Sequence, residues 1–489
     1  MGRARKDVSS DVDRRRFLQW TGAGLASAWA AGCSSTAPAP GSAAAEMPGT
    51  PDHRPNVLFI AVDDLNQHLG CYGNPVVRSP NIDRLAARGV RFAHAYPQAA
   101  TCVPSRYCFL SGMRKTTIYD PEAKRPALDN VTWLPAHFRE QGYFTARVDK
   151  VFHIGRDVPT CWDITEEGPR VNGRPVIMYT PQELRKLGIE DKLLYMKRYK
   201  KEVRGEGMRW GPIDVADEQL PDGMTARRGV ELLRTMPDRP EPFFLALGFR
   251  RPHLPWHVPP RYFDMYPPES IQLPPEQPGV ERVPEDIHRA GMRAYYAALT
   301  FMDTQLGLVL DEMDRLGLWD DTIVVLFGDN GYALGERDNF FSKWPPYESA
   351  TAVPLIVAAP HARLNGQASE HVVELIDIYP SLVDYCGLPK PEGPVGRSFV
   401  PLLNDADADW TDYGITEYDD RGKNGIRSAR YRYTESADGE PLMLYDLEED
   451  PYEHRNLVAE PAYADTVSRL SRLMHSVLER SRRPFSPQS

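Results

Sequence analysis

Four short runs along the chain are dominated by hydrophobic residues, with no polar residue alternating between them. They cover residues 56–62, 243–247, 322–327 and 354–358. Strands that are hydrophobic on both faces are typical of a parallel sheet covered by helices on each side. Residues 292–313 carry hydrophobic side chains at steps of three and four, which predicts one amphipathic helix. Strands alternating with helices predict an α/β fold.

The pattern changes after about residue 387. Short β-like runs surround Tyr431 and Leu442, and a helix is expected near residues 462–478. We therefore predict a large domain over residues 54–386, with a mostly parallel central sheet flanked by helices. A smaller C-terminal α+β subdomain is predicted over residues 387–489.

The charge of the chain argues against one class of partner. The formal net charge is −10 and the sequence pI is about 5.7, and Lys and Arg are scattered along the chain. A nucleic-acid-binding protein needs a basic patch or stripe, so we expect no nucleic-acid partner.

The N-terminus has the features of an export segment. Residues 14–18 read Arg-Arg-Arg-Phe-Leu, and a mildly apolar stretch runs from Trp20 to Gly32. This resembles a twin-arginine export signal, which implies the twin-arginine export machinery as a partner. Ala30-Ala31-Gly32-Cys33 is similar to a bacterial lipoprotein cleavage site, although Ala30 stands where Leu is usual. The alternative is a disordered N-terminus that contains three arginines by chance.

These features predict an export signal with a lipoprotein-type site over residues 1–33 and a flexible linker over residues 34–53, rich in Ser, Ala, Pro and Gly. We expect the protein to be exported, either to the periplasm or as a lipoprotein anchored on the outer side of the membrane. Contact with the membrane would be limited to the lipid on Cys33, because no later segment is long and apolar enough to span a bilayer.

Oxygen-bearing side chains follow two of the predicted strands. Asp63 and Asp64 come directly after the first, and Asp329 and Asn330 after the third. The carboxyl ends of parallel strands meet at the same edge of a sheet, where ligands bind. Either pair alone is typical of a helix cap or a turn. Both pairs together predict a site for a hard cation such as Ca²⁺ or Mg²⁺.

A cysteine is predicted at the start of a short helix between these two strands. Pro104 in the first turn and Gly112 after the end bracket the helix that Cys102 begins. Free backbone N–H groups and the helix dipole at this end favour an anion and a thiolate. Arg106 lies about one turn further on. The pattern predicts a nucleophile aimed at an oxyanion beside a metal ion.

Cys102-Val103-Pro104-Ser105-Arg106, with the later Ser111-Gly112, resembles the C-x-P-S-R…[ST]-G signature of the type I, formylglycine-dependent sulfatase family of the alkaline phosphatase superfamily. Further segments similar to the family follow in the same order; they are residues 63–64, 70–73, 79–83, 328–331, 444–447, 450–453 and 456–457. The resemblance implies an alkaline-phosphatase-like fold and hydrolysis of sulfate esters. It also implies that Cys102 is oxidised to formylglycine by a formylglycine-generating enzyme.

The resemblance also assigns the metal ligands. They would be Asp63, Asp64, Asp329 and Asn330, with the hydrated formylglycine at position 102 as a further ligand. The cation of the family is usually Ca²⁺, with Mg²⁺ as the alternative. One hydroxyl of the formylglycine diol would attack sulfur, and the second would lose its proton to expel sulfate.

The same resemblance gives roles to five further side chains. Arg106 and Lys150 would hold the diol in place, and His153 would take a proton from it. Lys343 and His253 would contact the sulfate ester, with His253 protonating the leaving oxygen.

Within the family, several segments are similar to the iduronate-2-sulfatase branch. They are residues 150–153, 251–255 and 334–336 with Lys343. Asn330 stands where that branch has His, and residues 337–344 differ. The likeness implies a sulfated saccharide substrate, with a uronate 2-O-sulfate as one candidate.

Two other functions remain as alternatives. The first is a phosphate or phosphonate ester hydrolase of the same superfamily. The second is a catalytically silent lipoprotein that binds glycans, which is disfavoured because each position expected to be catalytic holds a competent residue.

Four cysteines have no role in this chemistry. They are Cys71, Cys108, Cys161 and Cys386. The sequence allows three disulfide pairings among them, or none if they are small buried hydrophobic residues.

Overall fold

The fold is known from a computed structural model. It describes residues 54–122, 125–127, 131–168, 170–171, 174–175, 204–205, 209–418 and 422–481. The predicted export signal with Cys33, and the predicted linker, lie outside the described residues. In the described part of the chain, no helix combines the length and the hydrophobicity that crossing a bilayer requires.

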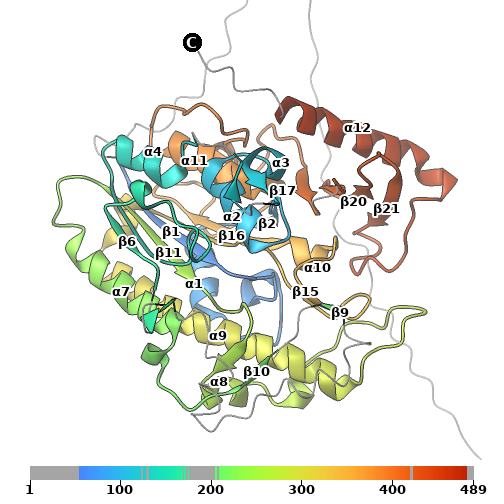
Figure 1. Ribbon diagram of the computed structural model, residues 1–489, viewed down its shortest axis with the longest axis horizontal. Helices are drawn as coiled ribbons and strands as arrows, with labels where there is room; N and C mark the ends of the chain where they lie inside the picture. The colour runs from blue at the N-terminus through green and yellow to red at the C-terminus, as the bar shows by residue number, and fades with distance from the viewer. Residues whose placement is uncertain are drawn as a thin grey trace, which may run out of the picture. The chain divides into compact units, whose positions relative to one another are not determined.

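An eight-stranded sheet forms the centre of the large domain (Figure 1), in the order β17-β2-β16-β13-β1-β11-β5-β6. Its strands are β1 (Asn56–Val62), β2 (Val90–Tyr96), β5 (Phe144–Asp149), β6 (Ile164–Glu166), β11 (Phe243–Phe249), β13 (Thr322–Gly328), β16 (Val353–Ala358) and β17 (Ala368–Glu374). All neighbouring strands are parallel except at β16, which is antiparallel to both β13 and β2. The predicted mostly parallel sheet is confirmed.

The hydrophobic runs report burial and not strand direction. All six residues of β16 are buried, as in β11 and β13. Its sequence therefore looks like that of a parallel strand even though it runs the other way.

Strand β1 contributes alternate side chains to two hydrophobic cores, one on each face of the sheet. Leu58, Ile60 and Val62 pack in the core under α1 (Pro80–Arg88), α7 (Pro221–Thr235) and α9 (Glu285–Leu316). Val57, Phe59 and Ala61 pack in the core under α2 (Cys102–Ser111), α4 (Leu134–Glu140) and α11 (Ile378–Tyr385). These helices cover opposite faces of the sheet (Figure 1). Helix α9 contains the helix predicted at residues 292–313.

The C-terminal subdomain is built on a second, antiparallel sheet. Its strands are β18 (Gly414–Glu417), β19 (Asn424–Arg427), β20 (Tyr431–Glu435) and β21 (Pro441–Asp446). Helix α12 (Ala464–Ser481) packs on this sheet and shares its core, which includes Ile415, Ile426, Tyr433, Leu444, Leu470 and Met474. The predicted small α+β subdomain is therefore present.

Shorter elements connect these layers. The helices are α3 (Lys115–Ile118), α8 (Pro260–Asp264) and α10 (Glu348–Thr351). The strands are β3 (Tyr119–Asp120), β4 (Arg125–Pro126), β7 (Arg170–Val171), β8 (Arg174–Pro175), β9 (Arg204–Gly205), β10 (Trp210–Pro212), β12 (Trp256–Val258), β14 (Ala333–Leu334) and β15 (Phe340–Ser342).

One glutamate of the large domain binds two arginines of the C-terminal sheet. Glu348 on α10 forms an ion pair with Arg432 and lies 3.5 Å from Arg427 Nε. The Tyr96 hydroxyl donates to Glu348 Oε1 at 2.5 Å. Burial alone would raise the pKa of Glu348, but the two arginines outweigh it and lower the pKa to about 2. The subdomain is thus attached to the large domain through a charged contact.

We expect Glu348→Gln to lower the free energy of unfolding by about 2 kcal/mol, between the values for surface and buried ion pairs. Because the folded-state pKa lies below the ordinary value of 4.5, the contribution is complete above that pH and is lost as the pH falls towards 2. Urea unfolding at pH 7 and pH 3 measures both effects. The exposed pair of Arg239 and Glu241 provides the control variant Glu241→Gln; equal losses in the two variants would contradict the assignment.

Candidate active site

The two oxygen-bearing pairs meet at one edge of the central sheet, as predicted. Asp63 and Asp64 follow β1, Asp329 and Asn330 follow β13, and these strands are parallel neighbours. The backbone N–H of Asp64 donates to Asp329 Oδ1 at 3.0 Å, and that of Asp329 donates to the Val62 carbonyl at 2.9 Å. Asp64 has a left-handed backbone with φ of 58°, which turns the chain sharply after the strand.

Cys102 is the first residue of α2 and lies in this cluster. Its Sγ is 3.5 Å from Asp64 Oδ1, and Lys343 Nζ lies 3.1 Å from the same sulfur. Burial, followed by the charge of Asp63, raises the pKa of the thiol well above its ordinary value. Desolvation and a carboxylate thus oppose the stabilisation of a thiolate that the helix N-terminus was predicted to give.

Arg106 is fully buried and holds the carboxylates together. Its Nε donates to Asp329 Oδ2 at 2.8 Å, and its Nη2 donates to Asp63 Oδ1 at 3.4 Å. Its Nη1 donates to the carbonyl oxygens of Lys150 and Val151, the latter at 3.0 Å. One guanidinium thus joins α2 to the ends of β1, β13 and β5.

Two lysines neutralise the aspartates of β1. Lys150 forms an ion pair with Asp63, and Lys343 Nζ lies 3.2 Å and 3.3 Å from the two carboxylate oxygens of Asp64. Burial would raise the pKa of Asp63, but Lys150, His253 and Arg106 together hold it well below its usual value. The pKa of Asp329 is raised to about 7, chiefly by burial.

The two predicted catalytic histidines lie beside the cluster. His253 Nε2 is 3.8 Å from Asp64 Oδ2, and its Nδ1 lies 2.6 Å from the Leu254 carbonyl oxygen. Burial and then Lys343 lower the pKa of His253. Burial and then Lys150 lower the pKa of His153 to about 3. The imidazole of His153 is therefore unprotonated at neutral pH and able to accept a proton.

The side chains of this cluster fit a divalent cation. Asn330 Nδ2 donates to Asp64 Oδ1 at 2.8 Å, which leaves Asn330 Oδ1 buried with no hydrogen-bond partner. Such an atom is costly unless a ligand pairs with it. Four potential ligand atoms also lie within 4.8 Å of one another, one from each of Asp63, Asp64, Cys102 and His253. Carboxylate and amide oxygens are the ligands that Ca²⁺ and Mg²⁺ prefer.

Two buried acidic residues that support the site were not predicted from the sequence. Asp149 ends β5 with φ of 63° and accepts hydrogen bonds from Arg250 at 2.7–2.9 Å. Asp222 on α7 accepts from the backbone N–H groups of Arg250 at 2.5 Å and Arg251 at 3.2 Å. They anchor the segments that carry Lys150 and His253. The sequence signal for Asp149 was an acidic residue at the end of a strand. It could have been used only if β5 had first been predicted as a strand.

The cysteines without a predicted role form no disulfide in the described part of the chain. Cys108, Cys161 and Cys386 are buried and free, and Cys71 is partly buried and free. Of the alternatives left open, the structure supports small hydrophobic residues.

Comparisons with known proteins agree on one family. The sulfatase family model matches residues 55–388, and the model of the N-sulphoglucosamine sulphohydrolase C-terminal region matches residues 335–480. A sulfatase of Formosa agariphila is 34% identical, covering 82% of this chain and 83% of its own. The iduronate 2-sulfatase of Homo sapiens is 31% identical, covering 83% of this chain and 78% of its own.

Solved structures share the fold. An enzyme in complex with its substrate D-glucosamine-2-N,6-O-disulfate superposes with a TM-score of 0.70 at 21% identity, covering 88% of this chain and 98% of that one. A phosphonate monoester hydrolase from Silicibacter pomeroyi also gives 0.70, at 24% identity, covering 88% and 96%. The fold is therefore common to hydrolases of both sulfate and phosphonate esters.

If Asn330 is a cation ligand, Ca²⁺ should stabilise the chelator-treated protein and lose this effect in Asn330→Leu. A ligand at a hundred times its Kd adds about 2.7 kcal/mol to the free energy of unfolding, which thermal unfolding detects as a rise in Tm. The matched control is Asn365→Leu, because Asn365 Oδ1 is also buried without a partner. A full Ca²⁺ response in Asn330→Leu would remove Asn330 from the ligand set.

Proposed function

The chain belongs to the sulfatase family and is a sulfuric ester hydrolase, and we propose that it removes O-sulfate from a saccharide at the site around Cys102. The observation that carries this proposal is the position of Cys102, at a helix N-terminus within 3.5 Å of both a carboxylate and a lysine. Formylglycine formed from Cys102 would supply the nucleophile, and Ca²⁺ or Mg²⁺ the Lewis acid that stabilises negative charge.

The chain's own residues divide the remaining work. Lys343, which contacts Cys102 Sγ, would bind the sulfate ester and balance charge that develops on its oxygens. Lys150, paired with Asp63, would help to hold the diol in place. Arg106 is saturated by carboxylates and carbonyls, so we assign it to holding the site in shape. His253, 3.8 Å from Asp64, is the residue proposed to protonate the leaving oxygen, and neutral His153 is proposed as the base.

A sulfated saccharide is the proposed substrate. The relatives include iduronate 2-sulfatases, so a uronate 2-O-sulfate is our first candidate. Trp344, next to Lys343, has 58% of its surface exposed. An aromatic face beside the sulfate-binding lysine offers a surface on which a sugar ring can stack.

The alternative is hydrolysis of phosphate or phosphonate monoesters. The fold does not distinguish this alternative from sulfate ester hydrolysis. The structure bound to a sulfated substrate and the phosphonate monoester hydrolase give the same TM-score of 0.70. A phosphate monoester carries close to two negative charges at neutral pH and a sulfate ester carries one. A phosphonate monoester also carries one, so charge separates a sulfate ester from the phosphate but not from the phosphonate. A direct comparison of matched esters distinguishes them.

We expect protein co-expressed with a formylglycine-generating enzyme to hydrolyse 4-nitrophenyl sulfate with a higher kcat/KM than 4-nitrophenyl phosphate or 4-nitrophenyl phenylphosphonate. Loss of a nucleophile costs about a thousandfold or more in kcat, so Cys102→Ala should remove the activity. Cys386→Ala, which changes another buried free cysteine, is the control and should stay active. A preference for the phosphate or the phosphonate would favour the alternative, and an active Cys102→Ala would contradict the proposed nucleophile.

We also propose that the protein is exported through its twin-arginine-like segment and held by a lipid on Cys33. Replacing Arg14 and Arg15 by Lys should keep the protein in the cytoplasm, while Cys33→Ala should release it from the membrane fraction in soluble form. Cell fractionation followed by immunoblotting measures both. Membrane-bound protein in Cys33→Ala would contradict the lipid anchor, and normal export of the double Lys variant would contradict the export route.

A further inference from the structure

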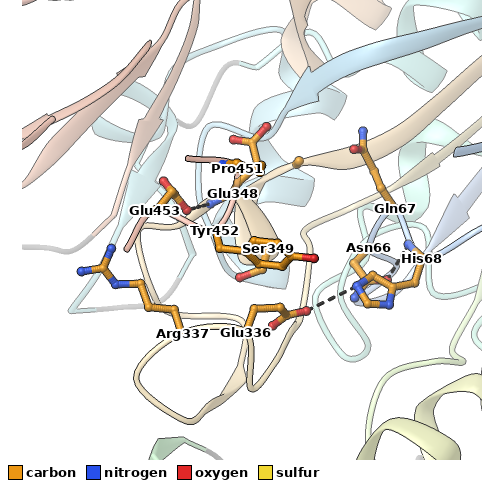
Figure 2. A pocket seen from close by; sticks show the side chains of 11 residues that line it. Asn66, Gln67, His68, Glu336, Arg337, Glu348, Ser349, Pro451, Tyr452 and Glu453 are labelled. Carbon is orange, nitrogen blue, oxygen red and sulfur yellow. Dashed lines mark hydrogen bonds and ion pairs between the residues drawn. The ribbon is translucent and has the colours of Figure 1, made fainter. Parts of the chain in front are cut away.

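A second pocket lies outside the cluster around Cys102 (Figure 2). Its volume is about 180 Å³, or roughly six times the volume that one water molecule occupies in the liquid. It is lined by three segments of the large domain and one of the C-terminal subdomain; the lining residues are 66–68, 336–337, 348–349 with 352, and 451–453. This volume fits a ligand with a single ring.

The large-domain side of the pocket offers a paired donor and acceptor. His68 Nε2 lies 3.3 Å from Glu336 Oε1, and His68 Nδ1 lies 2.9 Å from the Tyr296 hydroxyl. Glu336 Oε2 accepts a hydrogen bond from the backbone N–H of Leu334 at 2.5 Å, which fixes the carboxylate. Figure 2 shows His68 and Glu336 next to each other, joined by this contact. Such a pair is suited to a hydroxyl group, which both donates and accepts.

The C-terminal subdomain supplies an aromatic side chain. Tyr452 is 39% exposed, and its ring lies 5.8 Å from that of His454. In Figure 2, Tyr452 and Ser349 lie on the side of the pocket opposite His68. An exposed aromatic ring beside hydroxyl-binding groups is the combination that binds a sugar ring, through its apolar face and its hydroxyls respectively.

The pocket is close to the catalytic cluster. His68 is four residues after Asp64, so their Cα atoms are at most about 14 Å apart. The Tyr295 hydroxyl donates to the Asp64 carbonyl at 2.8 Å and accepts from the Asn66 N–H at 2.9 Å, which fixes this connection. Glu336 lies in the segment that leads from Asn330 to Lys343. Both sites therefore share the edge of the sheet where β1 and β13 end.

The charges of the pocket disfavour a second sulfate. Arg337 is the one Lys or Arg among the described lining residues, and its guanidinium lies over the rings of Tyr347 and Tyr445 at 4.4 Å and 4.8 Å. The carboxylate of Glu336 faces His68 instead of a permanent cation. A sulfate placed here would meet that carboxylate without a strong counter-charge.

From this geometry we infer that the pocket is a binding site for an uncharged sugar ring, adjacent to the ring that carries the sulfate ester. The inference rests on the proposed function and adds a requirement on the substrate. Tyr452 would stack on the ring, and His68 with Glu336 would bind its hydroxyls. Because the pocket joins both domains, the C-terminal subdomain would contribute directly to substrate selection.

Three substrates test this inference by their steady-state kinetics. They are 4-nitrophenyl sulfate, which has no second ring, and two synthetic disaccharides of 2-O-sulfated uronate joined to N-acetylhexosamine, one plain and one 6-O-sulfated. We expect the wild-type protein to prefer the plain disaccharide to the 6-O-sulfated one about tenfold in kcat/KM. Tyr452→Ala and His68→Ala should lower kcat/KM for the plain disaccharide about tenfold more than for the aryl sulfate, mainly through KM.

The matched control is His371→Ala, because His371 forms a similar partly exposed pair with Asp412 at 3.1 Å outside this pocket. It should leave the ratio between the substrates unchanged. Equal losses on all three substrates in Tyr452→Ala and His68→Ala would overturn the inference while leaving the proposed function intact. A wild-type protein that cleaves none of the three would overturn the proposed function, and this inference with it.

Discussion

Three buried carboxylates on one edge of the sheet require three buried cations. Asp63, Asp64 and Asp329 are each no more than 1% exposed, and removing a charge from water costs several kcal/mol unless a partner compensates it. The partners are Arg106 from α2, Lys150 from the end of β5, and Lys343 from the segment after β15. Each cation comes from a different element, so charge neutrality can be reached only when those elements are correctly placed.

This requirement explains the arrangement of the supporting residues. Arg106 ties the helix of Cys102 to the ends of three strands, and Ser105 donates to the Asp329 carbonyl at 2.5 Å. Asp149 and Asp222 hold the backbone that presents Lys150 and His253. A rigid, preorganised set of charges is what an enzyme needs to stabilise charge that develops on a transferring group. The same cluster leaves Asn330 Oδ1 buried without a hydrogen-bond partner, as expected of a cation ligand.

Much of this could be predicted from the sequence, for identifiable reasons. The runs at β1, β11 and β13 are hydrophobic on both faces because both faces are covered, so the pattern located the central strands and, with them, the paired aspartates. The bounds of α2 followed from Pro104 in its first turn and from Gly112 after its end, whose φ is 69°. The antiparallel direction of β16 could not be predicted, because the hydrophobic pattern reflects burial, and a strand is buried equally in either direction. The raised pKa of the Cys102 thiol could not be predicted either, because it depends on burial and on Asp63, which is distant in sequence.

The central claim is that position 102 works as formylglycine and not as a thiol. The most direct test is the mass of the proteolytic fragment that carries Cys102, from protein made together with a formylglycine-generating enzyme. Replacing CH₂SH by CHO lowers the mass by about 18 Da, and the account predicts this shift in the active protein. A fragment with the full mass of an unmodified cysteine, from protein that hydrolyses sulfate esters, would contradict it.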